Sequence, residues 1–423
     1  MMEPELRSVS TPPPLPQHGT PSEPDHDYLP DSSLEIANLV AQNRLEQNKE
    51  FPPITVDNIN QLREESKSSG DGKLQLYFAR YLLEAVKHLK PNPQDPNRAK
   101  QLKDNLSTES IKLIKKLASH KVGYADAQFF LGNLYGAGLY VKTDPEKAFS
   151  LYLQGSKQNH PECTYRAAVC YELGLGTRKD TRYAMQFYRK AANASEPSGM
   201  YKLAMILLHG LLGQQRNPKE AVSWLTRAAT MADTQHPQSV HELAKLYEQQ
   251  SSSVPSLIPD LDYARELYSQ AAQLGFAPSQ YKLGLAYENG ELNCPIDPKR
   301  SIAWYSRAAE QNDPHAELAL SGWYLTGVDL VLAPNDREAY LWASKAAERG
   351  MAKAEYAVGY YLEMGIGVPK SLEDAFVWYQ RAAGHGDIKA KQRLASEGKS
   401  QVKRRPTRDK NGKPPKDADC RIM

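Results

Sequence analysis

The chain has 423 residues, and its 24% charged and 40% hydrophobic content is that of a folded globular protein. Its net charge is only +3, no segment approaches the roughly 18 consecutive apolar residues of a membrane-spanning helix, and the N-terminus lacks the basic and apolar regions of a signal peptide. The four cysteines show neither a CxxC pair nor a framework spacing, which argues against a disulfide-stabilised or zinc-bound protein, so we expect a cytosolic chain.

Residues 1–70 form a proline-rich segment that we expect to be largely disordered, because it holds too few apolar residues to build a core. Eight prolines fall within the first 30 residues: Pro4, Pro12, Pro13, Pro14, Pro16, Pro21, Pro24 and Pro30. Within residues 32–68, a short apolar pattern predicts at most one short helix, around Leu34, Ile36, Leu39 and Val40.

Residues 71–123 predict two helices that form a modified first unit, or cap, at the start of a helical array. The apolar residues of the first helix are Leu74, Leu76, Phe78, Tyr81 and Leu82, and those of the second are Ile111, Ile114, Leu117 and Ala118. The proline-rich stretch at residues 91–96 separates the two helices, because proline disfavours helical backbone in the residue before it.

Residues 124–395 contain seven similar units, each closed by a pair of small residues. The successive pairs are separated by 36, 37, 43, 37, 38 and 36 residues: Gly155-Ser156, Ala191-Ala192, Ala228-Ala229, Ala271-Ala272, Ala308-Ala309, Ala346-Ala347 and Ala382-Ala383. A second series precedes these pairs, and in six units a glycine follows it three residues later: Tyr135, Tyr171, Leu207, Tyr247, Tyr287, Tyr324 and Leu362.

Each unit predicts a helix–turn–helix hairpin, which the last unit shows most clearly. Its first apolar set falls on one helical face, at Ala354, Val358, Tyr361 and Leu362, and its second at Ala375, Trp378, Tyr379, Ala382 and Ala383. Between them Gly365 and Gly367 allow the left-handed backbone that ends a helix. In three other units, an N-cap residue followed by proline predicts the start of the second helix: Asp144-Pro145, Asn217-Pro218 and Asp297-Pro298.

These residues resemble the Sel1-like repeat, a relative of the tetratricopeptide repeat. Two units carry most of its pattern, with Gly359, Gly365, Gly367, Val368, Ala375, Trp378, Tyr379, Ala382, Ala383 and Gly386 in one, and Leu131, Gly132, Tyr135, Gly138, Asp144, Lys147, Ala148 and Tyr152 in the other. The resemblance implies an all-α fold, an α/α superhelix or solenoid of stacked hairpins. One hairpin cannot bury both of its faces, so stability comes from stacking.

Two of the units depart from the pattern. The third has Ala204 and Leu207 where glycine and tyrosine are usual. The fourth lacks the turn glycine and carries an insertion at residues 249–255. Insertions in repeat arrays map to loops on one face, so this one is interpreted as a surface loop, with a binding loop as the alternative.

The last four residues, Cys420-Arg421-Ile422-Met423, fit the C-a-a-X prenylation motif, in which a terminal methionine favours a farnesyl group. A prenyltransferase would modify the thiol of Cys420 and recognise Ile422 and Met423. Arg421 is less typical of its position than an aliphatic residue. The alternative is an ordinary free cysteine near the C-terminus.

Residues 396–423 form a basic tail with nine Lys/Arg and four Asp/Glu, whereas the rest of the chain has 44 and 46. We expect a flexible tether in which these residues contact an anionic membrane: Lys399, Lys403, Arg404, Arg405, Arg408, Lys410, Lys413 and Lys416. Lipid and charge together supply the two signals that stable anchoring requires. The alternative, a nuclear-localisation or nucleic-acid patch, is disfavoured because no aromatic residues interleave with the run.

No catalytic motif is readable, so we predict that the chain is not an enzyme and binds no cofactor or metal. The pairs Gly136/Gly138, Gly174/Gly176 and Gly365/Gly367 lack the third glycine of a dinucleotide fingerprint, and each follows a helix. The ten histidines are scattered, and we expect His120 and His160 to cap helices or to be solvated.

The combination of Sel1-like repeats, a proline-rich N-terminus and a basic tail with a farnesylation motif resembles the fungal chitin-synthase regulators. The segment 74–82 is similar to the start of the region that this family shares. The resemblance implies a non-catalytic, prenylated scaffold that activates or localises the chitin synthase catalytic subunit, with no nucleic-acid partner. It places the chain on the cytoplasmic face of the plasma membrane, at the septum or bud neck. The alternative is a prenylated adaptor for another membrane trafficking or signalling complex.

Overall fold

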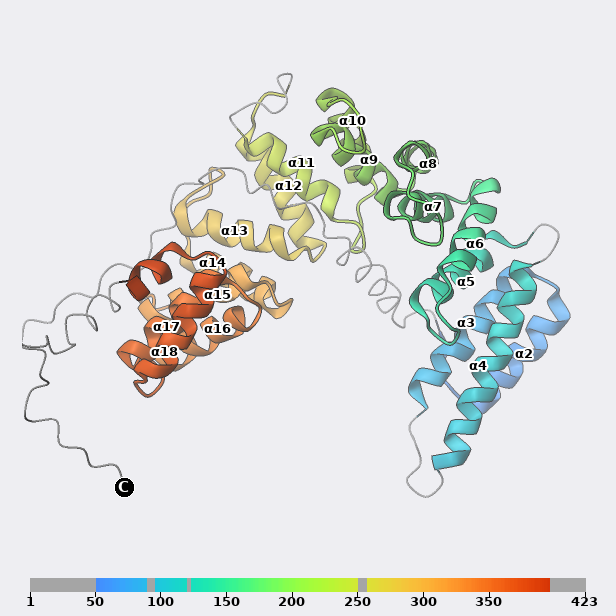
Figure 1. Ribbon diagram of the computed structural model, residues 1–423, viewed down its shortest axis with the longest axis horizontal. Helices are drawn as coiled ribbons and strands as arrows, with labels where there is room; N and C mark the ends of the chain where they lie inside the picture. The colour runs from blue at the N-terminus through green and yellow to red at the C-terminus, as the bar shows by residue number, and fades with distance from the viewer. Residues whose placement is uncertain (1–50, 90–95, 120–122, 250–256, 396–423) are drawn as a thin grey trace, which may run out of the picture. The chain divides into compact units, whose positions relative to one another are not determined.

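A computed structural model describes residues 51–89, 96–119, 123–249 and 257–395. These residues form the α-helices α2 to α18, with a single antiparallel bridge between Val328 and Leu332 as the only β-pairing within them (Figure 1). None of these helices combines the length and apolar composition needed to cross a membrane. The predicted all-α solenoid of Sel1-like hairpins is confirmed.

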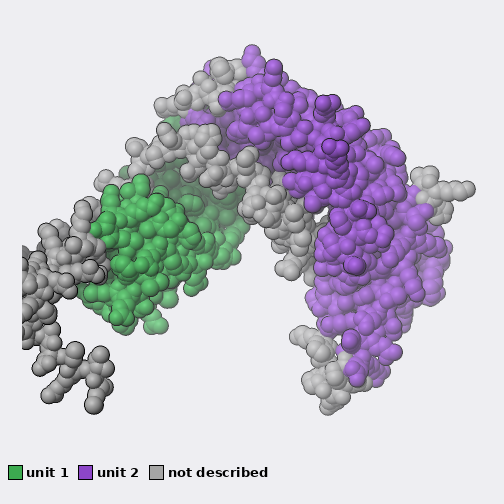
Figure 2. Space-filling view, viewed as in Figure 1, with its two compact units in different colours: residues 1–19, 260–423 green, residues 20–259 purple. Residues whose placement is uncertain are grey.

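The helices divide into two compact units, with the boundary between Pro259 and Asp260 (Figure 2). The first unit contains α2 (Val56–Ser69), α3 (Gly72–His88), α4 (Pro96–Ala118), α5 (Ala125–Ala137), α6 (Pro145–Lys157), α7 (Pro161–Leu173), α8 (Thr181–Asn193), α9 (Pro197–His209), α10 (Pro218–Thr230) and α11 (Gln238–Glu248). The second contains α12 (Leu261–Gln273), α13 (Ala277–Asn289), α14 (Pro298–Glu310), α15 (Pro314–Thr326), α16 (Asp336–Glu348), α17 (Ala352–Met364) and α18 (Leu372–Gly384). The boundary therefore falls in the fourth repeat, after its insertion.

Helix α2 lies inside the segment that the sequence analysis expects to be largely disordered. It is ordered by tertiary contacts, since Ile59 and Leu62 pack against the buried cluster that contains Phe78 and Leu82. The guanidinium of Arg63 also donates two hydrogen bonds to the Glu109 carboxylate of α4, at 2.8 and 3.0 Å. These long-range partners supply the apolar and ionic contacts that the local composition lacks. The expected helix around Leu34 and Val40 lies outside the described residues.

The hairpins begin and end where the sequence analysis places their signals. The side chains of Asp144, Asn217 and Asp297 accept hydrogen bonds from backbone N–H groups in the first turns of α6, α10 and α14. Gly365 and Gly367 adopt left-handed backbone, with φ of 78° and 67°. Both the predicted N-caps and the predicted left-handed glycines are confirmed.

The paired small residues let the second helix of each hairpin approach its neighbours closely. Nearly all of them are buried, from Gly155 and Ser156 in α6 to Ala382 in α18. The same helices also carry the large side chains of the core, among them the fully buried Tyr188 and Tyr305. The tyrosines at the end of the first helices, such as Tyr135 and Tyr171, stay partly exposed. The core tyrosines thus lie mainly on the second helices.

Helix α11 is the irregular element of the array. It has 11 residues where the other repeat helices have 13, and it ends at Gln249 in extended backbone. No glycine is present there to adopt the left-handed conformation that closes five of the other six first helices. Residues 250–256, which hold most of the insertion, lie outside the described residues, so its two interpretations both remain.

Two N-cap aspartates are expected to make stability depend on pH with opposite signs. Burial raises the pKa of Asp313 above its ordinary value of 3.8, although the Ala316 N–H and His315 oppose this shift. The contribution of Asp313 to the stability of the folded state is therefore fully present below that ordinary value and is lost as pH rises through the folded-state pKa. Asp313→Asn keeps a good N-cap, so the melting temperature of the variant relative to the wild type should increase from about pH 3 to about pH 7.

Asp144 is the matched control for that experiment. The hydrogen bond from the Lys147 side chain holds the pKa of Asp144 below its ordinary value, so its contribution is present at neutral pH and lost on acidification. The melting temperature of Asp144→Asn relative to the wild type should therefore decrease over the same pH range. Parallel curves for the two variants in thermal unfolding would contradict at least one of the two assignments.

Candidate protein-interaction surface

The site residues predicted from the tail lie outside the described residues. These are the lipidation residue Cys420, the recognition residues Ile422 and Met423, and the basic residues from Lys399 to Lys416. Their roles stay predictions. The described residues instead provide a surface that the sequence analysis did not identify.

This surface is made by the fifth residue of each repeat, which lies on the first helix. We call this set the aromatic row, because six of its seven members carry an aromatic ring: Phe129, Tyr165, Tyr201 and His241 in the first unit, and Tyr281, Leu318 and Tyr356 in the second. All seven side chains are partly exposed. The first helices of neighbouring repeats contact one another directly at α5 and α7 in the first unit and at α13 and α15 in the second, so members of the row lie on adjoining helices there.

Rings of the row are held in place by tyrosines of the second helices. The ring centroids of Tyr165 and Tyr188 are 5.9 Å apart, and those of Tyr281 and Tyr305 are 5.6 Å apart. Tyr356 packs on Tyr379 at 5.4 Å in the last repeat. Each outer ring therefore rests on a buried one, which fixes its position before any partner binds.

The supporting tyrosines are themselves fixed by carboxylates of the first helices. The hydroxyl of Tyr305 donates to Glu288 at 2.6 Å, and that of Tyr379 donates to Glu363 at 2.7 Å. Tyr188 donates to Glu172 in the same way. Burial and the neighbouring carboxylate raise the pKa of Tyr305, so it remains a neutral donor.

Charged pairs that each include a residue of a first helix add polar contacts. The Lys202 ammonium lies 3.3 Å from Glu172, which belongs to the preceding repeat. In the second unit, Lys282 pairs with Glu291 at 2.9 Å, and Arg393 pairs with Glu363. Rigid aromatic side chains with polar groups at their edges are the composition that protein interfaces favour.

The most buried carboxylates do not form a catalytic pair. Glu317 is 1% exposed and its carboxylate is 3.1 Å from the Arg349 guanidinium. Glu355 is fully buried and lies 2.8 Å from His385 Nδ1 and 3.3 Å from Arg381. Each carboxylate thus faces cations near the C-terminal end of the second helix in its own repeat. This arrangement ties the two helices of each hairpin together.

The cysteines in the described part of the chain are suited to packing and not to chemistry. Cys163, Cys170 and Cys294 are buried free thiols. Burial raises the pKa of the Cys170 thiol to about 12, so it is not a thiolate at neutral pH. Among the described residues, no group of three or more His, Cys, Asp or Glu side chains could hold a metal ion.

His160 acts as a helix cap, as expected from the sequence. Its Nδ1 accepts a hydrogen bond from the Cys163 N–H at 3.2 Å, and its Nε2 lies 2.8 Å from Asp126. The accepting Nδ1 leaves the proton on Nε2, which donates to the carboxylate. The second predicted cap, His120, lies outside the described residues.

The aromatic row carried a signal in the sequence. Its members recur at intervals of 36, 36, 40, 40, 37 and 38 residues, close to the intervals of the small-residue pairs. The signal was missed because tyrosine at a repeat position is interpreted first as core. Only the burial of the side chains separates the partly exposed series from the buried one.

Comparison with known proteins places the repeats in one family. The profile of the Sel1 repeat matches residues 125–160, 161–196, 197–233, 237–276, 277–313, 314–351 and 352–387. The crystal structure of a Sel1 repeat protein from Oxalobacter formigenes aligns with a TM-score of 0.53 and 24% identity, covering 85% of this chain and 93% of that one. This likeness shows the fold alone.

Three curated relatives match the chain at higher identity than this structure does. Chitin synthase regulatory factor 3 of Schizosaccharomyces pombe is 40% identical over 369 residues, 86% of this chain and 39% of its own length. Chitin synthase regulator SKT5 of Saccharomyces cerevisiae is 36% identical over 353 residues, 80% of this chain and 50% of its own length. Activator of C kinase protein 1 of the same yeast is 35% identical over 323 residues, 68% of this chain and 51% of its own length.

The chain thus spans about two fifths to one half of the length of these three relatives. They are named as regulators and activators, and the matching structure is a Sel1 repeat protein. The prediction that the chain is a non-catalytic repeat protein is confirmed by these comparisons, because the relatives are named as regulators and the repeats match the Sel1 family.

Proposed function

The chain belongs to the Sel1 repeat family and has relatives named chitin synthase regulators, and from this premise we propose that it is a regulatory scaffold that binds a chitin synthase. The observation that carries the proposal is the identity of 36 to 40% with such regulators over at least 80% of the chain. A match of that extent must overlap most of the repeats at residues 125–387, which hold the helices that present the aromatic row.

The same proposal places the scaffold at the cytoplasmic face of the plasma membrane, at the septum or bud neck. The support is the sequence of the tail, in which Cys420, Ile422 and Met423 fit a farnesylation motif beside a run of basic residues. One lipid chain alone gives marginal anchoring, and the basic residues add attraction to an anionic leaflet. In this scheme a prenyltransferase modifies the chain and the repeats then hold the synthase at that membrane.

The test is affinity capture of the full chain from the membranes of a chitin-producing fungus. We expect a chitin synthase catalytic subunit among the captured proteins and reduced cell-wall chitin when the gene is deleted. Cys420→Ser should move the chain from the membrane fraction to the soluble fraction, whereas Cys294→Ser, at a buried thiol, should leave the distribution unchanged. Capture of soluble proteins alone, with normal chitin, would refute the proposal.

A second candidate is an adaptor for another membrane signalling complex. The observation that favours it is the 35% identity with Activator of C kinase protein 1 over 68% of the chain. Both candidates predict the same loss of membrane fractionation for Cys420→Ser. They differ in chitin content, which the second leaves unchanged, and in the captured partner.

A further inference from the structure

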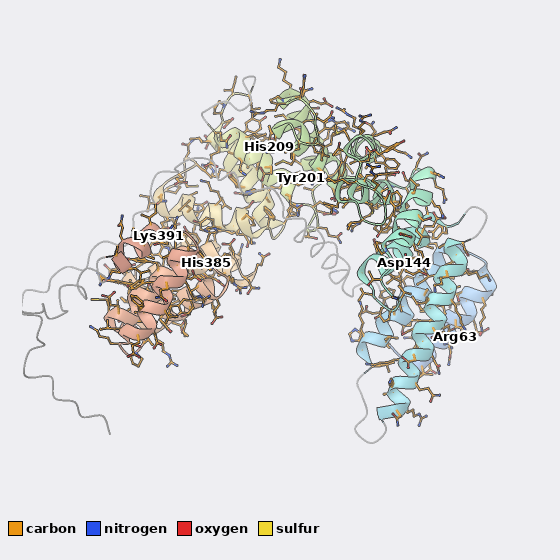
Figure 3. All side chains as sticks on the ribbon, viewed as in Figure 1. Arg63, Asp144, Tyr201, His209, His385 and Lys391 are labelled. Carbon is orange, nitrogen blue, oxygen red and sulfur yellow. The ribbon has the colours of Figure 1, made fainter. Side chains whose placement is uncertain are left out.

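A cavity of about 610 Å³ opens between α4 and the loop of the first repeat hairpin, where α5 is joined to α6. Figure 3 labels Asp144 at this place, at the start of α6. Most of the lining comes from this loop and from the C-terminal part of α4: Ile111, Lys115, Tyr135, Tyr140, Val141, Lys142, Thr143, Asp144 and Lys147.

The cavity carries an excess of positive charge. Three lysines line it, and the one carboxylate among its lining residues, Asp144, is 2.7 Å from the ammonium of Lys147. Lys115 and Lys142 have no carboxylate partner within the described part of the chain. Lys115 and Lys147 lie 6.0 and 5.6 Å from the centroid of the Tyr135 ring, so two ammonium groups approach one aromatic ring. Such a site attracts an anion.

The adjoining stretch of α4 adds to the positive charge near the cavity. Residues 110–118 contain Lys112, Lys115 and Lys116, all exposed, and no acidic residue. The nearest carboxylate along the helix, Glu109, is already bound by Arg63. The positive charge at this end of α4 is therefore uncompensated along the helix.

Two apolar side chains are exposed at the rim of the cavity. Leu139 is 40% exposed and Tyr140 is 39% exposed. The loop that presents them is held by hydrogen bonds, from the Leu139 N–H to the Leu134 carbonyl at 3.2 Å, from the Asp144 N–H to the Tyr135 carbonyl at 3.0 Å and from the Tyr140 hydroxyl to the Leu83 carbonyl at 3.4 Å. Their exposure is therefore built into the first repeat and is not fraying of a chain end.

We propose that this patch, defined as Lys115, Leu139, Tyr140, Lys142 and Lys147, binds the phosphate headgroup of anionic phospholipids at a membrane surface. The lysine ammonium groups donate to phosphate oxygens, while the Leu139 side chain and the exposed part of the Tyr140 ring contact the boundary between headgroups and acyl chains. Proteins that bind at a membrane interface combine exposed apolar side chains with surrounding basic residues, and this patch has the same arrangement. An acidic peptide would satisfy the lysines, but it would leave the exposed parts of the Leu139 side chain and the Tyr140 ring in water, so the observations favour a lipid surface.

The experiment uses the full chain made in bacteria, which carries no prenyl group, and floats it with vesicles. Vesicles of phosphatidylcholine with phosphatidylserine are compared with pure phosphatidylcholine. The tail residues Lys399, Lys403, Arg404, Arg405, Arg408, Lys410, Lys413 and Lys416 are replaced by glutamine in every sample, so that only the folded body can bind. The triple variant Lys115→Gln, Lys142→Gln, Lys147→Gln should then lower the affinity for the anionic vesicles about tenfold or more.

The matched control removes three exposed lysines elsewhere on the same unit: Lys100, Lys157 and Lys219. It should bind as the parent does, since its net charge equals that of the triple variant. A second variant, Leu139→Ser with Tyr140→Asn, should also weaken binding and keep the salt dependence of the parent. Asparagine is chosen because Tyr140 has positive φ, which asparagine tolerates.

Equal binding by the triple variant and the control would overturn the proposal. The proposal would also be overturned if the chain bound inorganic phosphate or polyglutamate saturably but did not bind the vesicles. That result would assign the cavity to a free anion or to an acidic protein. Because the chain carries neither a lipid nor a basic tail, failure here is independent of the prenylation test. Thermal unfolding of each variant confirms that the fold is retained.

Discussion

Replacing Gly284 by alanine is expected to destabilise the second unit by about 1 to 3 kcal/mol, although alanine is the better helix former. Gly284 lies inside α13, and a Cβ atom at this position would be 2.5 and 2.6 Å from two ring carbons of Tyr305. The ring cannot move away easily, because it is fully buried, packs on Tyr281 and is hydrogen-bonded to Glu288. The clash therefore outweighs the gain in helix propensity.

Gly322 in α15 is the matched control for this substitution. It is also an interior helical glycine of the second unit, but a Cβ atom there would meet nothing within 4 Å. Gly322→Ala should raise stability by up to about 1 kcal/mol, as expected for an unobstructed helix position. Thermal unfolding measures both effects, and hydrogen exchange should localise the loss in Gly284→Ala to α13 and α14. Equal effects of the two substitutions would show that the Tyr305 ring adapts.

The close approach of two helices at Gly284 shows why the sequence predicted so much of the fold. Small residues at fixed spacing mark where one helix must approach another, and Gly132 and Gly359 repeat the arrangement of Gly284 against Tyr152 and Tyr379. N-cap residues and left-handed glycines then fix the helix ends. All of these signals are local, so one sequence is enough to show them.

The features that were not predicted depend on contacts between distant residues. Helix α2 is held by residues of α3 and α4 that lie as many as 46 positions further along the chain, so its own composition indicates disorder. The aromatic row and the cavity at Lys115 and Lys142 become visible only when partly exposed side chains can be separated from buried ones. The tail motif is the opposite case, since its chemistry is readable directly from Cys420 and its neighbours.

The largest effect on partner binding is expected from substitutions in the aromatic row. Tyr165→Ala combined with Tyr201→Ala should weaken binding of the full chain to detergent-solubilised chitin synthase by about 30-fold or more, the loss expected on removal of a central tyrosine anchor from an interface. The two side chains occupy the same position in adjacent repeats of the first unit, and Tyr201 is labelled in Figure 3. Tyr165 rests on the buried Tyr188, so it meets a partner with little loss of conformational freedom.

Tyr183 provides the control because it belongs to a second helix, α8, and is 51% exposed. Its ring stacks on Tyr171 at 5.2 Å, so Tyr183→Ala also removes one aromatic contact from the same unit. If the first helices form the binding face, this variant should bind the synthase with wild-type affinity while losing a similar, small amount of stability. If Tyr183→Ala weakens binding as much as the double variant does, the second helices contribute as much as the aromatic row, and the assignment of the binding face to the first helices is wrong. Measuring both affinities together with both melting temperatures distinguishes a lost contact from a loosened hairpin, because only a loosened hairpin lowers the two quantities in parallel.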